Sequence, residues 1–125
     1  MPFGQPLSAH GVIVEWVAKS RVEIDAARLL VLNAASAIDL ADAKAALLEI
    51  AEAKIWVPQM ALTVIDRAIQ AHGAMAVCQD TPLALMWAQI RTLRIADGPD
   101  EVHLQQVGKR ENNLRREGIS KKLGD

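Results

Sequence analysis

Apolar residues recur at alternating steps of three and four along two long stretches of the chain, and this spacing constrains the fold most. It places most of the recurring residues on one face of a helix, the face that packs against another helix. Alanine is abundant and aromatic residues make up only 3% of the chain, which favours closely packed helices. The sequence therefore predicts an all-α protein. The recurring positions are Ile13, Val17, Ser20, Ile24, Ala27 and Val31 in the first stretch, and Leu47, Ile50, Lys54, Val57, Ala61, Val64 and Ala68 in the second.

Capping and helix-breaking residues set the expected bounds of the first two helices. The first should start near residue 7 or 8, with Ser8 as its N-cap, and end near Ile38. The second should open at Asp39 or Asp42, where acids suit the helix dipole. Pro58 should kink this helix rather than divide it in two, because the apolar spacing continues through the proline. The lysine on its apolar face is expected to extend its charged end into solvent.

Two shorter helices are expected in the second half of the chain. The third should run from about Pro82 to Ala96, with proline in its first turn, and the fourth from about residue 100 to Glu117. Two long and two shorter helices predict an up-down four-helix bundle over residues 1–117. Residues 118–125 form a polar tail.

Composition narrows the classes of function. A net charge of −1 gives no polyanion-binding surface, and the basic tail lacks interleaved aromatic residues, so we expect no nucleic-acid partner. No apolar run approaches the ~20 residues of a membrane span, and the first residues carry no targeting signal. The single cysteine, Cys78, excludes a disulfide framework and favours an intracellular setting, the cytoplasm in a bacterium. His10, His72 and His103 lack metal-ligand spacing, so we expect no metal site.

Two junctions between helices remain as candidate functional segments. They are 69-IQAHGAMAVCQDTPLA-84 and 94-RIADGPDEVH-103. In a bundle two junctions can meet at one end and shape a small site, although glycine, proline and aspartate are also ordinary turn formers. The second junction concentrates three acids beside a glycine, a proline and a histidine. This raises the question whether it is only a turn between two helices or whether one of its carboxylates takes part in catalysis.

The order of short motifs in the chain resembles the C-terminal helical domain of the acyl-CoA dehydrogenases. F-G-Q-P-L-x-x-H near the N-terminus resembles the segment that opens that domain. I-Q-x-H-G, Q-D-x-P-L and R-x-A-D-G-P-D-E-V-H follow in the family's order, so that the resemblance covers residues 2–111. In this family an N-terminal helical domain and a middle β domain precede the bundle and hold most of the flavin and acyl-CoA pocket. The bundle builds a dimer or tetramer core and contributes groups to FAD, including the FAD of a neighbouring subunit.

The resemblance implies FAD contacts at five positions. Phe3 and Leu7 match the cofactor-side residues of the opening segment, Gln70 matches a flavin-contacting glutamine, and Gly73 and Ala74 match the start of a glycine-rich junction. Departures from the family pattern weaken this cofactor site. Gly11 stands in place of a glutamine, Ala74 and Ala76 in place of glycines, and Pro99 in place of a hydroxyl residue.

Asp97 falls where many members of the family carry a catalytic glutamate followed by glycine. The resemblance implies that this carboxylate removes the α-proton of an acyl thioester while a hydride leaves the β-carbon for flavin. Aspartate is one methylene shorter than glutamate, so its reach matters. The alternative role of Asp97 is to cap a helix end. Without the two preceding domains we expect the chain to be inactive, and acyl-CoA to bind only when they are supplied.

Two functions are therefore carried forward. One is the C-terminal domain of a FAD-dependent acyl-CoA dehydrogenase, with a candidate base, FAD contacts and a homo-oligomer interface. The other is a non-catalytic oligomerisation or interaction module derived from that family, which the departures at the cofactor positions favour.

Overall fold

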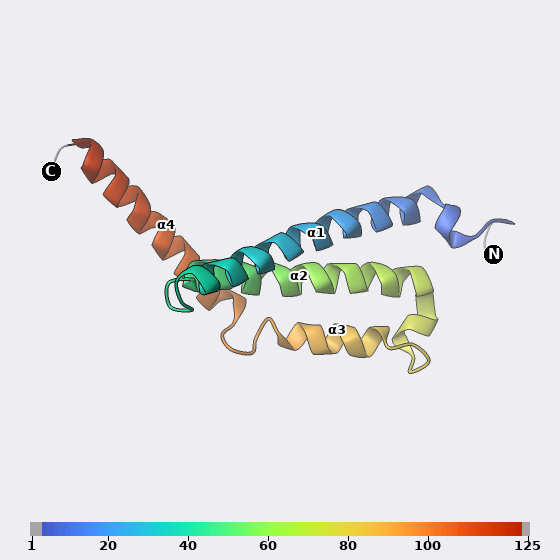
Figure 1. Ribbon diagram of the computed structural model, residues 1–125. Helices are drawn as coiled ribbons and strands as arrows, with labels where there is room; N and C mark the ends of the chain where they lie inside the picture. Colours follow the sequence, from blue (N-terminus) through green and yellow to red (C-terminus); the bar gives the residue numbers. More distant parts are fainter. Residues whose placement is uncertain (1–3, 124–125) are drawn as a thin grey trace.

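The computed structural model describes residues 4–123, with side chains described to residue 118, and within them the fold is helical throughout. The prediction of an all-α protein with four helices is confirmed. The helices are α1 (Gly11–Leu40), α2 (Leu47–His72), α3 (Leu83–Thr92) and α4 (Asp100–Leu123), with short 3-10 segments η2 (Leu7–Ala9) and η3 (Gly73–Val77) (Figure 1).

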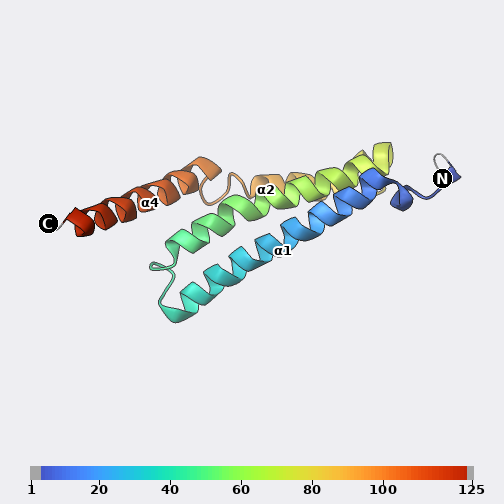
Figure 2. The ribbon, with the colours of Figure 1, turned by 90° about the horizontal axis from the view of Figure 1, so that it is seen from above.

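Helix α2 is the central element, and the principal contacts of α1, α3 and α4 are all with it. Helices α1 and α3 each run antiparallel to α2, which gives the up-down order expected of a bundle (Figure 1). Helix α4 starts beside the N-terminal part of α2 and then projects away from the other helices in both views (Figures 1 and 2). Much of α4 is therefore exposed.

Helix ends differ from the predicted ones by about one to two turns. Ser8 lies in η2 rather than at an N-cap, and α1 begins only after His10, whose backbone is extended. Helix α3 stops at Thr92 instead of near Ala96, while α4 continues to Leu123, past the predicted end near residue 117. After Thr92 the chain continues as turns to Asp97, where the positive φ of Asp97 and Gly98 is incompatible with a right-handed helix.

The predicted start of α2 at Asp39 or Asp42 is wrong, because residues 43–46 form a turn and the helix begins only at Leu47, whereas the predicted continuity of the helix is correct. Asp42 precedes the helix and its Oδ1 accepts a hydrogen bond of 2.8 Å from the Ala45 amide, which forms the turn that leads into Leu47. Pro58 is buried within α2 and the helix continues through it. The prediction of one helix rather than two is therefore confirmed.

The predicted apolar face of α1 is only partly buried. Ala27 and Ala34 are buried against α2, whereas Val17 is 66% exposed and Val31 47% exposed. An exact alternation of threes and fours drifts around a straight helix of 3.6 residues per turn, so some of its positions fall at the edge of the contact face. The contact therefore follows the small residues, which allow the two helices to approach closely.

The core of this chain is small and built mainly from alanine. The buried apolar residues are Ala27, Ala34, Ala46, Ala51, Leu62 and Ala76. Large apolar side chains lie outside it, among them Val22 (69% exposed), Leu29 (67%) and Leu40 (86%). Exposed apolar surface on this scale is typical of interaction surfaces in proteins.

Within residues 4–123, no helix has both the length and the apolar character needed to cross a membrane.

Candidate functional site

The 93–99 turn, which joins α3 to α4, contains an unusual backbone. Asp97 has φ +56° and is the only non-glycine residue with positive φ between residues 4 and 123. Gly98 follows with φ +103°. Aspartate tolerates the left-handed region better than most residues, because its short polar side chain can interact locally with the backbone. Two consecutive left-handed residues turn the chain sharply and leave the Asp97 side chain exposed.

Lys54 reaches this turn from α2. Its Nζ donates hydrogen bonds to the carbonyl oxygen of Leu93 and, at 2.7 Å, to that of Ala96. The last carbonyls of a helix lack intrahelical partners and carry partial negative charge, so an ammonium group suits them. The expectation that Lys54 extends into solvent is therefore wrong, because these carbonyls bind its charged end.

Asp100 is the buried carboxylate of the turn, with 6% exposure. Its Oδ2 accepts hydrogen bonds from Arg94, at 2.7 Å from Nε and 2.6 Å from Nη2, and from Gln59 Nε2 at 3.2 Å. The Asp100 amide also donates to the Arg94 carbonyl at 3.3 Å. Asp100 therefore has a structural role, holding the start of α4 to α2 and to the end of α3.

Asp97 differs from Asp100 in every one of these respects. It is exposed, and the described part of the chain gives its carboxylate no hydrogen bond or ion pair. Of these two acids, Asp97 is the one whose carboxylate is available to a ligand.

His103, in the first turns of α4, lies beneath Gly98. A Cβ added to Gly98 would lie 3.1 Å from His103 Nε2. Both ring nitrogens of His103 are shielded from solvent, and within residues 4–118 neither has a hydrogen-bond partner. Position 98 thus requires glycine for two reasons, its positive φ and the close approach of the imidazole.

The cofactor positions implied by the resemblance gather around the other end of α2. Gln70 is exposed in its last turn, and Gly73 ends the helix with φ +63° and open space where a Cβ would lie. Ala74 is exposed, and Leu7 is 44% exposed in η2, which contacts the start of α1 at the same end of the molecule (Figure 1). Phe3 lies outside the described residues.

The departures from the family pattern have different structural settings. Ala76 is fully buried, so its methyl group packs inside the protein and not toward a ligand at the surface. Ala74, Gly11 and Pro99 are exposed. Of the two alanines that replace glycines, only Ala74 therefore presents a methyl group to an incoming ligand.

The two candidate junctions do not meet, contrary to the expectation above. Lys54 contacts the 93–99 turn, whereas Gln70 lies sixteen residues later on the same helix. At 1.5 Å per residue this separates the two regions by about 24 Å along α2. The physical reason is that α3 runs back along α2 and carries the second junction away from the first (Figure 1).

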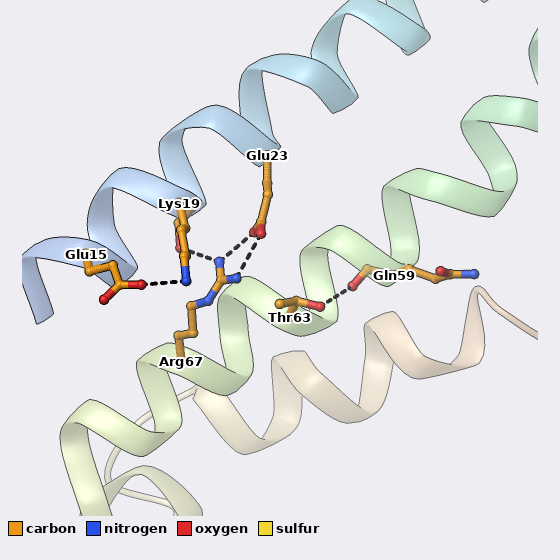
Figure 3. A network of polar contacts seen from close by, with 7 residues as sticks. Glu15, Lys19, Glu23, Gln59, Thr63 and Arg67 are labelled. Carbon is orange, nitrogen blue, oxygen red and sulfur yellow. Dashed lines mark hydrogen bonds and ion pairs between the residues drawn. The ribbon is translucent and has the colours of Figure 1, made fainter. Parts of the chain in front are cut away.

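A third polar cluster, which sequence reasoning missed, joins α1 to α2. Arg67 donates to Glu23 through two hydrogen bonds, of 2.5 Å from Nη1 and 2.8 Å from Nη2, and Nη1 also donates to Ser20 Oγ at 3.1 Å (Figure 3). The hydrogen bonds from Arg67 lower the pKa of Glu23, and those to Glu23 raise the pKa of Arg67. The only sequence signal was position, since Glu23 and Arg67 each directly precede a member of the predicted apolar face.

An open apolar groove of about 370 Å³ lies beside this ion pair, between α1 and α2. Trp16, Ile24 and Val64 contribute to its lining, and Arg67 and Ser20 also border it. No group of three or more metal-ligand side chains occurs in the described part of the chain.

The fold is an all-α helical domain whose α3–α4 turn carries an exposed carboxylate directly before a glycine. The family model for the acyl-CoA dehydrogenase C-terminal domain matches residues 2–111, and the chain belongs to the acyl-CoA dehydrogenase family. That family is generally FAD-dependent and generally oligomeric.

Similar proteins agree with this assignment. The chain is 52% identical over 109 residues to acyl-CoA dehydrogenase family member 11 of Rattus norvegicus, and 55% identical over 109 residues to family member 10 of Mus musculus. Each alignment covers 87% of this chain, but only 14% and 10% of the relatives. A solved structure from Mycobacterium abscessus, named as an acyl-CoA dehydrogenase, superposes with a TM-score of 0.89 at 43% identity. It covers 92% of this chain, which spans 28% of that protein.

Proposed function

We propose that this chain acts as the C-terminal domain of a FAD-dependent acyl-CoA dehydrogenase that forms the α,β double bond of an acyl-CoA thioester. The observation that carries the proposal is the exposed carboxylate of Asp97, which has no partner within the described residues and lies in a left-handed turn. The sequence resemblance matches this residue to the family's catalytic acid. The single cysteine supports an intracellular setting for the enzyme.

Asp97 has the properties that a general base needs before substrate binds. Its carboxylate has no partner to displace within the described residues, and the turn that holds it accepts hydrogen bonds from Lys54 of α2. Such a turn limits the entropy lost when the carboxylate aligns with the α-proton. An apolar acyl chain and the preceding domains would exclude water from the carboxylate during proton transfer. FAD, when bound, supplies the acceptor for the hydride from the β-carbon.

The other end of α2 fits a part of the cofactor. The exposed Gln70 amide can donate and accept hydrogen bonds, and the open, left-handed Gly73 allows a ligand to approach the backbone. The exposed Ala74 methyl makes this approach less close than a glycine would. The residues therefore fit FAD with fewer contacts than the family pattern provides.

The separation of about 24 Å along α2 between the 93–99 turn and Gln70 supports different roles for these two regions within an oligomer. A chain whose Asp97 serves one active site presents Gln70 and Gly73 to a different region, which suits the FAD of a neighbouring subunit. The exposed apolar side chains of α1 supply surface for such an assembly, a dimer or a tetramer.

The direct test is a chimera in which this chain replaces the matching region of the Mycobacterium abscessus protein. We expect the chimera to bind flavin and to reduce an artificial electron acceptor with an acyl-CoA substrate. Asp97→Asn should retain flavin and lower kcat by roughly 100-fold or more, the usual contribution of a general base. Full activity of the chimera that carries Asp97→Asn would refute the role of this carboxylate. By itself the chain should be inactive with acyl-CoA.

One observation favours the second candidate, a non-catalytic oligomerisation module. Large apolar side chains are exposed along α1, and this surface suits assembly whether or not flavin binds. Gel filtration with light scattering and excess FAD separates the two functions. Flavin that co-elutes with the oligomer, and is lost in Gln70→Ala, supports the enzyme domain; an oligomer that elutes colourless supports the module.

A further inference from the structure

The geometry points to Lys54 as a positioning residue for Asp97. It acts through the backbone of the 93–99 turn, and the inference rests on the proposed role of Asp97 as base. Lys54 Nζ donates to the carbonyl oxygens of Leu93 and Ala96, which are 39 and 42 residues away in sequence. No other side chain donates to the carbonyls of this turn in the described part of the chain.

The Ala96 carbonyl is the decisive acceptor. It belongs to the peptide plane that also contains the Asp97 amide, because the peptide bond is planar. Holding this oxygen therefore orients the plane from which the left-handed Asp97 backbone departs. The second bond, to Leu93, holds the other end of the same turn. Lys54 thus fixes the segment directly before the carboxylate.

Lys54 is itself held on a firm support. It lies on α2 between Ala51, which is 1% exposed, and the buried Pro58. The two hydrogen bonds from Lys54 therefore tie the 93–99 turn to a part of α2 that is itself packed in the protein. The Arg94–Asp100 ion pair has a different function, because its carboxylate lies beyond Gly98 and secures the start of α4.

Hydrogen exchange on the full chain tests the backbone part of this inference. Lys54→Met removes the donors and keeps an unbranched stem. We expect the Ile95 and Ala96 amides, which donate to the Thr92 carbonyl, to exchange at least ~10-fold faster, while α1 amides keep their rates. Lys54→Arg should restore rates to within roughly 3-fold, because guanidinium also donates to carbonyls. Lys19→Met, at a remote exposed lysine of α1, is the matched control and should leave the turn unchanged.

The chimera described above tests the functional part. Lys54→Met should lower kcat ~10- to 100-fold through a misplaced base, with KM within roughly 3-fold, and Lys54→Arg should recover most of kcat. Unchanged exchange in the turn would overturn the inference, and so would equal acceleration across α1 and α2. Full kcat in Lys54→Met, alongside a loss in Asp97→Asn, would also overturn it. If Asp97→Asn is itself active, the proposed function fails, which is a distinguishable result.

Discussion

The ion pair between Arg67 and Glu23 gives the most quantitative prediction for this fold. It joins α1 to α2, and the side chains are only 19% and 28% exposed. The two nitrogen–oxygen distances are 2.5 and 2.8 Å. At such distances the Coulomb attraction is about 6–7 kcal/mol with an effective dielectric constant of ~20, before desolvation and side-chain ordering are subtracted. Measured hydrogen bonds to charged groups retain about 1.5–3 kcal/mol. We expect a coupling free energy near ~1.5 kcal/mol, the lower end of that range.

A double-mutant cycle with Arg67→Met, Glu23→Gln and the double variant measures this coupling by urea unfolding, followed by circular dichroism. Arg67→Met alone should cost about 2 kcal/mol, because it leaves a half-buried carboxylate without its partner. All variants are compared at one protein concentration, since assembly adds to apparent stability. The matched control is a cycle on Glu15 and Lys19, whose side chains are more than half exposed and should couple less. A coupling for Arg67 and Glu23 no larger than the control would refute the reasoning.

The pH dependence of the same pair has a definite sign. The hydrogen bonds from Arg67 lower the pKa of Glu23 in the folded protein, so the folded state binds this proton less readily than the unfolded state. The stabilisation is therefore fully present above the ordinary glutamate value of about 4.5 and is lost as the pH falls through the lower, folded pKa. The stability advantage of the wild type over Glu23→Gln should narrow below pH 4.5, and an advantage that stays constant to lower pH would contradict this assignment.

Five further substitutions should separate the roles of individual residues. Gly98→Ala should lower the free energy of unfolding in urea by about 1–3 kcal/mol, because the backbone is left-handed there and the new Cβ contacts His103. Gly73→Ala places its Cβ in open space and should cost only about 1–2 kcal/mol for the positive φ. Asp100→Asn should lower the free energy of unfolding by about 3 kcal/mol, because it removes the buried carboxylate that pairs with Arg94. Asp97→Asn, at an exposed position, should change it by no more than about 0.5 kcal/mol. Equal effects of the two substitutions would contradict the distinction between these acids. Leu29→Lys, at an exposed apolar position of α1, should shift the oligomer toward smaller species in light scattering without loss of helix content, and an unchanged mass would exclude this position from the interface.

The periodicity of the sequence was enough to predict the presence of the helices, although it predicted the buried face of α1 only in part, since Val17 and Val31 are exposed. Pro58 shows how far this extends, since the apolar spacing correctly predicted one helix through a proline. The motif order was also enough to predict the family, which the match over residues 2–111 confirms. The roles of Asp97 and of the cofactor positions stay predictions.

The contacts that fix the candidate site could not be read from the sequence, because they join residues far apart in the chain. Lys54 looked like a solvent-facing lysine, since nothing local predicts carbonyl acceptors 39 and 42 residues later. The Arg67–Glu23 pair likewise depends on how far α1 is shifted along α2. Apolar spacing repeats with every turn of the helix, so it fits equally well when one helix is shifted by a whole turn. The placement of the two junctions at opposite ends depended on the direction of α3, a feature of topology rather than of local pattern.

Helix α2 has a consequence for how chains of this architecture can change in length. Lys54 and Gln70 lie on one uninterrupted helix, so any residue inserted between them would rotate one end by about 100° and shift it by about 1.5 Å relative to the other. Insertions and deletions in this span would disturb the 93–99 turn and the Gln70 end together. The connections just before Leu47 and just after Val77 have no such constraint from a continuous helix. Length variation among proteins that share this bundle should therefore be confined to these connections, because α2 sets the distance between the 93–99 turn and the Gln70 end.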